Sequence, residues 1–152
     1  MRIEALDTTP NSFCGFRFGS KLDDATSHDG VLIKQVKLAQ PFRMFSGAAL
    51  VADPSDHRLF KIEMIATGFS QHATTDHVIR EYNTTRDVLT GFYNVKPQKV
   101  PVKDESSTAC CLFEIDDLNF AIMLMRIRDN MFLLAVHGDK QKSKDVWTIN
   151  SL

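Results

Sequence analysis

Histidines, cysteines and clustered carboxylates are the features of this sequence best suited to chemistry, since imidazole, thiolate and carboxylate groups bind metals and transfer protons. The chain of 152 residues contains five histidines and three cysteines. Asp53, Asp56 and His57 lie in one short segment and offer two types of cation ligand. The same segment contains Pro54 and Ser55, a composition typical of a tight hairpin turn. We therefore favour a turn over a metal site there.

The other histidines do not have the spacing of a metal or catalytic site. His72 and His77 are five positions apart, about 140° around a helix, so they do not share a face as a metal-binding pair four apart would. His28 and His137 are isolated in the sequence. The glycines also occur singly, without the spacing of a phosphate-binding loop. We predict no catalytic residue, no metal site and no cofactor.

The three cysteines leave two interpretations open. Cys110 and Cys111 are adjacent in an apolar stretch, which is unlike the accessible, electropositive setting of a reactive thiolate. Neighbouring residues of a strand point to opposite faces, so a bond between these two is disfavoured. In an oxidising compartment Cys14 is able to pair with one of them, Cys111 being the candidate, and the bond would add about 3 to 4 kcal/mol. The alternative is three reduced cysteines that act as small core residues.

Length and charge balance exclude several classes of protein. The chain carries 18 basic and 19 acidic residues, a formal net charge of −1, so it has no general attraction for nucleic acid or anionic membranes. No apolar run approaches the roughly 18 residues of a membrane-spanning helix. We expect a single domain over residues 1–152, without a nucleic-acid partner and without membrane insertion.

Alternation of apolar and polar residues with period two predicts that much of the chain is strand. A first strand is expected at 13–19, and a longer one from 31 to 45 that Pro41 interrupts. Residues 48–52 and 59–69 are expected to form a hairpin around the aspartate-rich turn.

The second strand of that hairpin has the clearest alternation. Its apolar residues Phe60, Ile62, Met64 and Ala66 are assigned inward, and Lys61, Glu63 and Thr67 outward. We therefore expect both charged side chains of this strand, Lys61 and Glu63, to face solvent.

One amphipathic helix is predicted at about 75–91. Thr74 or Thr75 is a suitable N-cap, and apolar positions recur at spacings of three and four. The stripe consists of Val78, Tyr82, Thr85, Leu89 and Phe92. Gly91 or Asn94 accepts the left-handed conformation that ends many helices.

The remaining segments are expected to be irregular. Ser20 and Asp23 have the pattern of a helix start, but the segment lacks an apolar stripe, so any helix there is short. Residues 1–11 are expected to fray, and the polar segment 96–107 to form an exposed loop.

Three apolar runs near the C-terminus, at 109–115, 120–127 and 131–137, predict an antiparallel meander. The second and third runs are apolar on both faces, which indicates burial of both faces. The helix covers one face. The tail, 139–152, is expected to fold back over part of the other face, and a partner protein or a second copy of the chain is the alternative cover. The predicted fold is α+β, a single antiparallel sheet of about six to seven strands with one main helix on one face.

Two short segments resemble a loose class of small bacterial secreted or periplasmic proteins. One is the strand end Gly15-Phe16-Arg17-Phe18-Gly19, and the other is the helix end from Leu89 to Pro97, where Asn94 replaces the usual glycine. The resemblance implies an antiparallel α+β domain similar to β-lactamase-inhibitor-protein-like or TATA-binding-protein-like folds. It also implies a periplasmic or secreted location, whereas the N-terminal residues lack the apolar core of a signal peptide and leave a cytoplasmic location open.

Two functions are weighed on this basis. The favoured one is a non-enzymatic protein-binding or assembly module, in which the meander packs on a protein partner or on a second protomer. The expected partner surface is Met123, Met125, Ile127, Met131 and Leu133. The rival is an enzyme or small-ligand carrier with an apolar pocket between sheet and helix, with Cys14, His57 or Tyr82 at its mouth.

Overall fold

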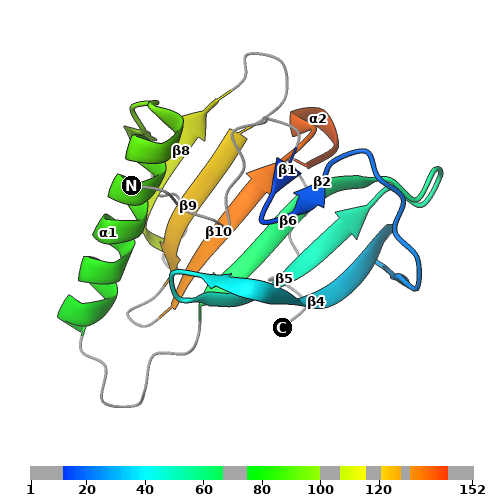
Figure 1. Cartoon of the computed structure of the whole chain (residues 1–152), viewed down its shortest axis with the longest axis horizontal. Helices are drawn as coiled ribbons and strands as arrows, with labels where there is room; N and C mark the ends of the chain where they lie inside the picture. Colours follow the sequence, from blue (N-terminus) through cyan, green and yellow to red (C-terminus); the bar gives the residue numbers. More distant parts are fainter. Residues whose placement is uncertain (1–11, 67–74, 100–106, 116–120, 128–130, 144–152) are drawn as a thin grey trace.

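The computed structural model describes residues 12–66, 75–99, 107–115, 121–127 and 131–143. Within these ranges, one curved antiparallel sheet carries a long helix on one side (Figure 1). The α+β class predicted from the sequence is confirmed. In this part of the chain, no helix is both long and apolar enough to cross a membrane.

The described residues form two sheets and two helices. A two-stranded hairpin, β1 (Ser12–Phe13) and β2 (Phe16–Arg17), precedes the main sheet. The strands of the main sheet are β3 (Thr26–His28), β4 (Val31–Phe42), β5 (Phe45–Ala52), β6 (Leu59–Ala66), β7 (Gln98–Lys99), β8 (Ser107–Glu114), β9 (Ala121–Ile127) and β10 (Met131–His137). The helices are α1 (Thr75–Tyr93) and α2 (Lys140–Ser143).

The main sheet joins two meanders through strands that are distant in the sequence. The strand order is β3-β4-β5-β6-β10-β9-β8-β7, with every pairing antiparallel. The central pairing of β6 with β10 sets Lys61 opposite His137 and Glu63 opposite Ala135. Within the described sheet, the two halves of the chain are therefore paired through β6 and β10 at its centre.

The predicted elements agree with most of the observed ones. The helix ends at Tyr93, and Asn94 takes the expected left-handed conformation at φ 55°. The sheet has eight strands, with a separate hairpin of two, and the prediction of six to seven was therefore wrong. Two strands of the main sheet were missed: β3 formed where a short helix was considered, and β7 formed inside the expected loop. The single strand expected at 13–19 was wrong, since β1 and β2 form a hairpin outside the main sheet. The Ser20 hydroxyl bonds the Arg17 carbonyl at 2.5 Å, so it caps a turn instead of a helix.

The core face of the sheet packs against α1 and the β1–β2 hairpin. The buried apolar side chains of this cluster come from every large strand, with Tyr82 and Leu89 from α1. They include Phe13, Phe42, Phe45, Leu50, Ile62, Met64, Cys111, Phe113, Ile122, Leu124, Leu134 and Val136. The Phe13 ring meets the Phe42 ring edge-on at 5.9 Å.

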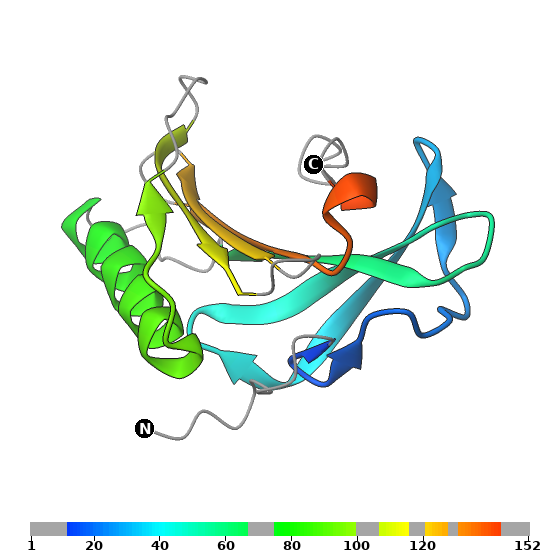
Figure 2. The same ribbon diagram turned by 90° about the horizontal axis from the view of Figure 1, so that it is seen from above.

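The β4–β5 turn closes this core against the helix. The pairing of β4 with β5 is irregular between Lys37 and Phe42, the stretch that contains Pro41, as expected for a strand interrupted by proline. In Figure 2 the two strands reach beneath β9 and β10 toward α1. At the turn, Arg43 Nη2 donates to both carboxylate oxygens of Glu81, at 3.0 and 3.2 Å. The ion pair thus joins the first meander to the helix.

The second face of the sheet carries α2. Figure 2 shows α2 on the opposite side of the sheet from α1 and the β1–β2 hairpin. The helix follows directly on β10 and lies against β6, where Ser143 Oγ donates to the Phe60 carbonyl at 3.2 Å. Gly138, at the turn into α2, packs closely beneath the Phe18 ring, since a Cβ there would lie 2.3 Å from ring carbons.

Candidate functional site

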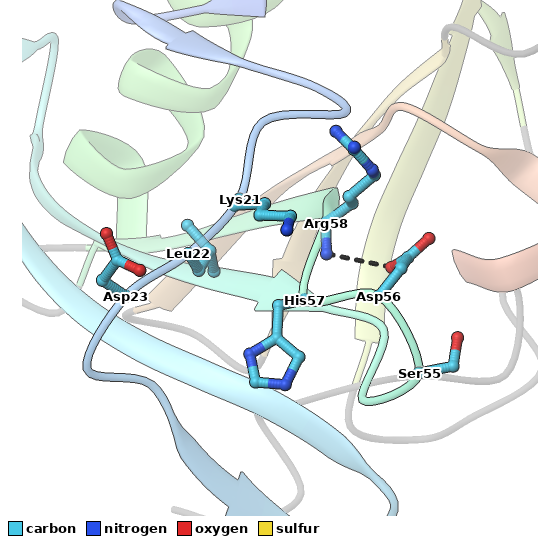
Figure 3. A pocket seen from close by; sticks show the side chains of 7 residues that line it. All are labelled: Lys21, Leu22, Asp23, Ser55, Asp56, His57 and Arg58. Carbon is cyan, nitrogen blue, oxygen red and sulfur yellow. Dashed lines mark hydrogen bonds between the residues drawn. The ribbon is translucent and has the colours of Figure 1, made fainter.

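An open pocket of about 490 Å³ lies between the segment after β2 and the β5–β6 turn (Figure 3). Its lining is polar apart from one leucine: Lys21, Leu22, Asp23, Ser55, Asp56, His57 and Arg58. Backbone hydrogen bonds connect its two walls, including Leu22 N to the His57 carbonyl at 2.8 Å. The pocket therefore lies where two hydrogen-bonded segments meet.

The charged groups of this pocket do not converge on one point. The Arg58 guanidinium donates to the Gly19 carbonyl at 2.6 Å, and the Asp56 carboxylate accepts the Arg58 backbone N–H at 3.0 Å. In Figure 3 the Asp23 carboxylate, the His57 ring and the Arg58 guanidinium point in different directions. These contacts shape the walls and do not assemble a reactive centre.

The aspartates near His57 take part in turn hydrogen bonds. Asp53 Oδ1 accepts bonds from the backbone N–H and the hydroxyl of Ser55, at 2.9 and 2.8 Å. Its other oxygen lies 3.1 Å from Lys142 Nζ. The Ser55 bonds and then Lys142 lower the pKa of Asp53 to about 2. Among the described residues, no three His, Cys, Asp or Glu side chains gather as a metal site would require.

A second polar group, which we call the charged cluster, lies on the second face of the sheet and consists of Lys61, Glu63 and His137. Their exposed fractions are 0%, 1% and 7%. Lys61 Nζ lies 3.9 Å from Glu63 Oε2, and Lys61 and His137 are cross-strand partners on β6 and β10. Charged side chains are rarely buried to this extent in proteins. The cluster is therefore the most unusual chemical feature of the described chain.

The start of the C-terminal tail covers the charged cluster. Ser143 of α2 is completely buried, and its carbonyl oxygen accepts a bond of 3.4 Å from Lys61 Nζ. The Lys142–Asp53 ion pair ties the same helix to the β5–β6 turn. Burial lowers the pKa of Lys61 from its usual 10.5 to about 8, and the Glu63 carboxylate opposes this shift.

The expectation that Lys61 and Glu63 face solvent was wrong. The alternation along β6 was interpreted correctly, because Ile62 and Met64 lie in the core. The polar side of the strand is buried as well, since β10 and α2 enclose it. The signal available in the sequence was the doubly apolar run 131–137, but only the fold shows that this run pairs with β6.

Among the described residues of the expected partner surface, only some are partly exposed in the structure. Leu133 is fully buried within the chain, so it does not form part of a partner surface. Met123 and Met125 are half-buried on the second face. The side chains of Ile127 and Met131 lie outside the described part of the structure. Leu112, which the sequence did not single out, is half-buried opposite Met123.

The three cysteines are free thiols in the structure, so the Cys14–Cys111 bond considered from the sequence is not formed. Cys14 is half-buried in the β1–β2 turn, and Cys110 and Cys111 are buried on opposite faces of β8. Burial raises the pKa of Cys14 to about 12 and that of Cys110 to about 11. Thiols with such pKa values are poor nucleophiles at neutral pH.

The residues expected at the mouth of an apolar pocket between sheet and helix are not brought together. Tyr82 is buried on α1, where its hydroxyl donates to the Leu124 carbonyl at 3.4 Å. His57 lies in the β5–β6 turn, at the opposite end of the molecule from α1 in both views (Figures 1 and 2). The core between helix and sheet is filled with side chains at Tyr82 and Leu89.

The chain was also compared with known proteins. Neither protein-family models, nor curated proteins, nor solved structures give a match.

Proposed function

We propose that the protein is a non-enzymatic assembly module that associates with a second copy of itself. The association surface is the methionine patch, by which we mean Leu112, Met123 and Met125. All three are apolar, half-buried and on the second face of β8 and β9, where Leu112 stands directly opposite Met123. This row of partly exposed apolar side chains is the observation that carries the proposal.

The composition of the methionine patch suits protein contacts. Methionine side chains are flexible and polarizable, so they adapt to a partner surface. A flat row across two strands is able to pack on the same row of a second protomer about a two-fold axis. The open pocket lined by Lys21 and His57 supports no competing function, because its charged groups do not converge.

The experiment measures molar mass by light scattering after size exclusion, over a range of micromolar concentrations. The wild-type chain is expected to dimerise, and Met125→Glu to be monomeric because it places a charge in the interface. Ile33→Glu is the matched control, since Ile33 is also half-buried on the second face but lies on β4. A wild-type chain that stays monomeric throughout, or equal loss of dimer in both variants, would contradict the proposal.

We further propose a bacterial extracytoplasmic location, because the Gly15–Gly19 and Leu89–Pro97 segments resemble small bacterial secreted or periplasmic proteins. The test is to express a tagged full-length gene product and to fractionate the cells. Recovery in the periplasm or medium is the expected result, and recovery in the cytoplasm would overturn it.

A further inference from the structure

The charged cluster combines an amine, a carboxylate and an imidazole in an enclosed position. Lys61 and Glu63 are two positions apart on β6 and therefore point to the same face. His137 joins them from β10 as the cross-strand partner of Lys61. An amine beside a proton-transferring carboxylate, shielded from bulk water, is the arrangement needed for covalent chemistry at lysine.

We propose that the charged cluster is a covalent binding site for a small carbonyl compound, an aldehyde or ketone, which condenses with the Lys61 amine. This inference does not depend on self-association, since no residue of the charged cluster belongs to the methionine patch.

The reaction consumes an amine and a carbonyl group and releases water. The nitrogen lone pair of neutral Lys61 attacks the carbonyl carbon, the N–C bond forms, and the π electrons move to oxygen. The Glu63 carboxylate accepts a proton from nitrogen and delivers it to that oxygen, giving a carbinolamine. A second proton transfer through Glu63 lets the C–O bond break and water leave. The product is an imine, and no oxidant or reductant is required.

The surroundings favour this chemistry at Lys61 over the other lysines. Because burial lowers its pKa to about 8, Lys61 has a far larger neutral fraction at pH 7.5 than an exposed lysine. The residues flanking Lys61 across the neighbouring strands are Val51 and His137, and those flanking Glu63 are Ala49 and Ala135. The bulk on the sheet is therefore smallest beside the carboxylate, which suits a small ligand.

Access to Lys61 depends on the position of α2. The helix has four residues, and the polar contacts that hold it near Lys61 are the Lys61–Ser143 and Ser143–Phe60 bonds and the Lys142–Asp53 ion pair. The ion pair is partly exposed, with side-chain exposures of 42% and 24%. Exposed pairs of this kind contribute little to stability, so the Lys142–Asp53 pair adds little to the cost of displacing α2.

The test uses the full-length wild-type chain, propionaldehyde as the probe and cyanoborohydride to trap the imine at pH 7.5. Peptide mapping by mass spectrometry then compares propylation of Lys61 with that of the exposed Lys37 and Lys96 in the same sample. Lys61 is expected to react about tenfold faster, since its larger neutral fraction outweighs its restricted access. Reaction at the exposed lysines alone, or equal rates at all three, would overturn the proposal.

Two variants test whether Glu63 and α2 take part in the reaction, or whether Lys61 reacts only because it is a buried amine. Glu63→Gln should slow labelling of Lys61 and leave labelling of Lys37 unchanged. The loss of proton transfer is expected to outweigh the larger neutral amine fraction, which follows because the carboxylate no longer raises the pKa of Lys61. Lys142→Gln should speed labelling of Lys61, because α2 is less firmly held. Circular dichroism verifies that each variant is folded. If Glu63→Gln fails to fold, the wild-type comparison of Lys61 with exposed lysines still decides the question, and Glu63→Gln labelling at the wild-type rate would refute the role of Glu63.

Discussion

The two faces of the central strands β6 and β10 are both buried, but they are buried in different ways. On the core face, Ile62, Leu134 and Val136 pack among apolar side chains and have no exposed surface. On the second face, Lys61 and Glu63 of the same strand are equally buried beneath a four-residue helix. One strand therefore presents an ordinary hydrophobic core on one side and an enclosed ion pair on the other.

This contrast separates what stabilises the fold from what makes it unusual. Burial of apolar surface stabilises the folded state by about 25 cal/mol per Å². Burial of an ion pair often contributes no net stability, because both charges lose hydration. The core face therefore accounts for the stability of the sheet, whereas the buried charges of the second face are not expected to add to it.

The largest effect is expected from removing a core side chain. Leu124→Ala should lower the free energy of unfolding by about 3 kcal/mol, since Leu124 is fully buried in the core cluster. Met125→Ala is the matched control on the other face of the same strand, and it should cost about 1 kcal/mol because Met125 is only half-buried. Urea denaturation at a protein concentration low enough to keep the chain monomeric measures both. Equal costs would show that the two faces of β9 are equally important to stability.

The next effect tests whether the Lys61–Glu63 pair stabilises the protein. Lys61→Met should cost about 3 kcal/mol, because it removes the ammonium group 3.9 Å from the buried Glu63 carboxylate. The double variant Lys61→Met, Glu63→Leu should recover most of this loss, since no charge of the pair remains. Urea denaturation of both variants provides the comparison. A double variant less stable than the single one would mean that the pair itself is strongly stabilising.

A smaller effect is expected from pH. The pKa of Lys61 is about 8 in the folded chain and 10.5 when unperturbed, so between these values the unfolded state holds a proton that the folded state lacks. Stability from this group therefore rises with pH through that window. The stability difference between wild type and Lys61→Met should grow by about 1 kcal/mol from pH 7 to pH 9.

The pH dependence must be measured as a difference from Lys61→Met, because the cysteines change the free energy of unfolding in the opposite direction as pH rises. The pKa values of Cys14 and Cys110 are raised in the folded chain, so above the unfolded thiol pKa their contributions fall as pH rises. Both proteins share this effect, and it cancels in the difference. A difference that is constant with pH would show that the pKa of Lys61 is not lowered.

The smallest effect is expected at the ion pair that joins the β4–β5 turn to α1. Glu81→Gln should cost about 0.5 kcal/mol, because Arg43 and Glu81 remain partly hydrated. Asp87→Asn serves as control, since Asp87 pairs with its sequence neighbour Arg86 within the described residues and is 71% exposed. Thermal unfolding of the two variants side by side measures the effect. A cost above that of Met125→Ala would assign the turn a larger role in closing the core.

Local patterns in the sequence determined most of the secondary structure. The stripe that includes Tyr82 and Leu89 predicted α1. The sequence left its end open between Gly91 and Asn94, and the structure places the left-handed residue at Asn94. Alternation predicted β6 and placed Ile62 and Met64 in the core. These features depend on residues that are close in the sequence, so a short window is sufficient to find them.

Only the tertiary structure decided whether the polar residues on β6 are buried or exposed. Lys61 and Glu63 alternate with apolar neighbours as solvent-facing residues do, and nothing local distinguishes them from Lys34 or Lys37 on β4. Their burial follows from the pairing of β6 with β10, whose residues are about seventy positions away, and from the return of α2 across the second face. The charged cluster arises from contacts between distant segments, and a periodic pattern within one strand does not contain that information.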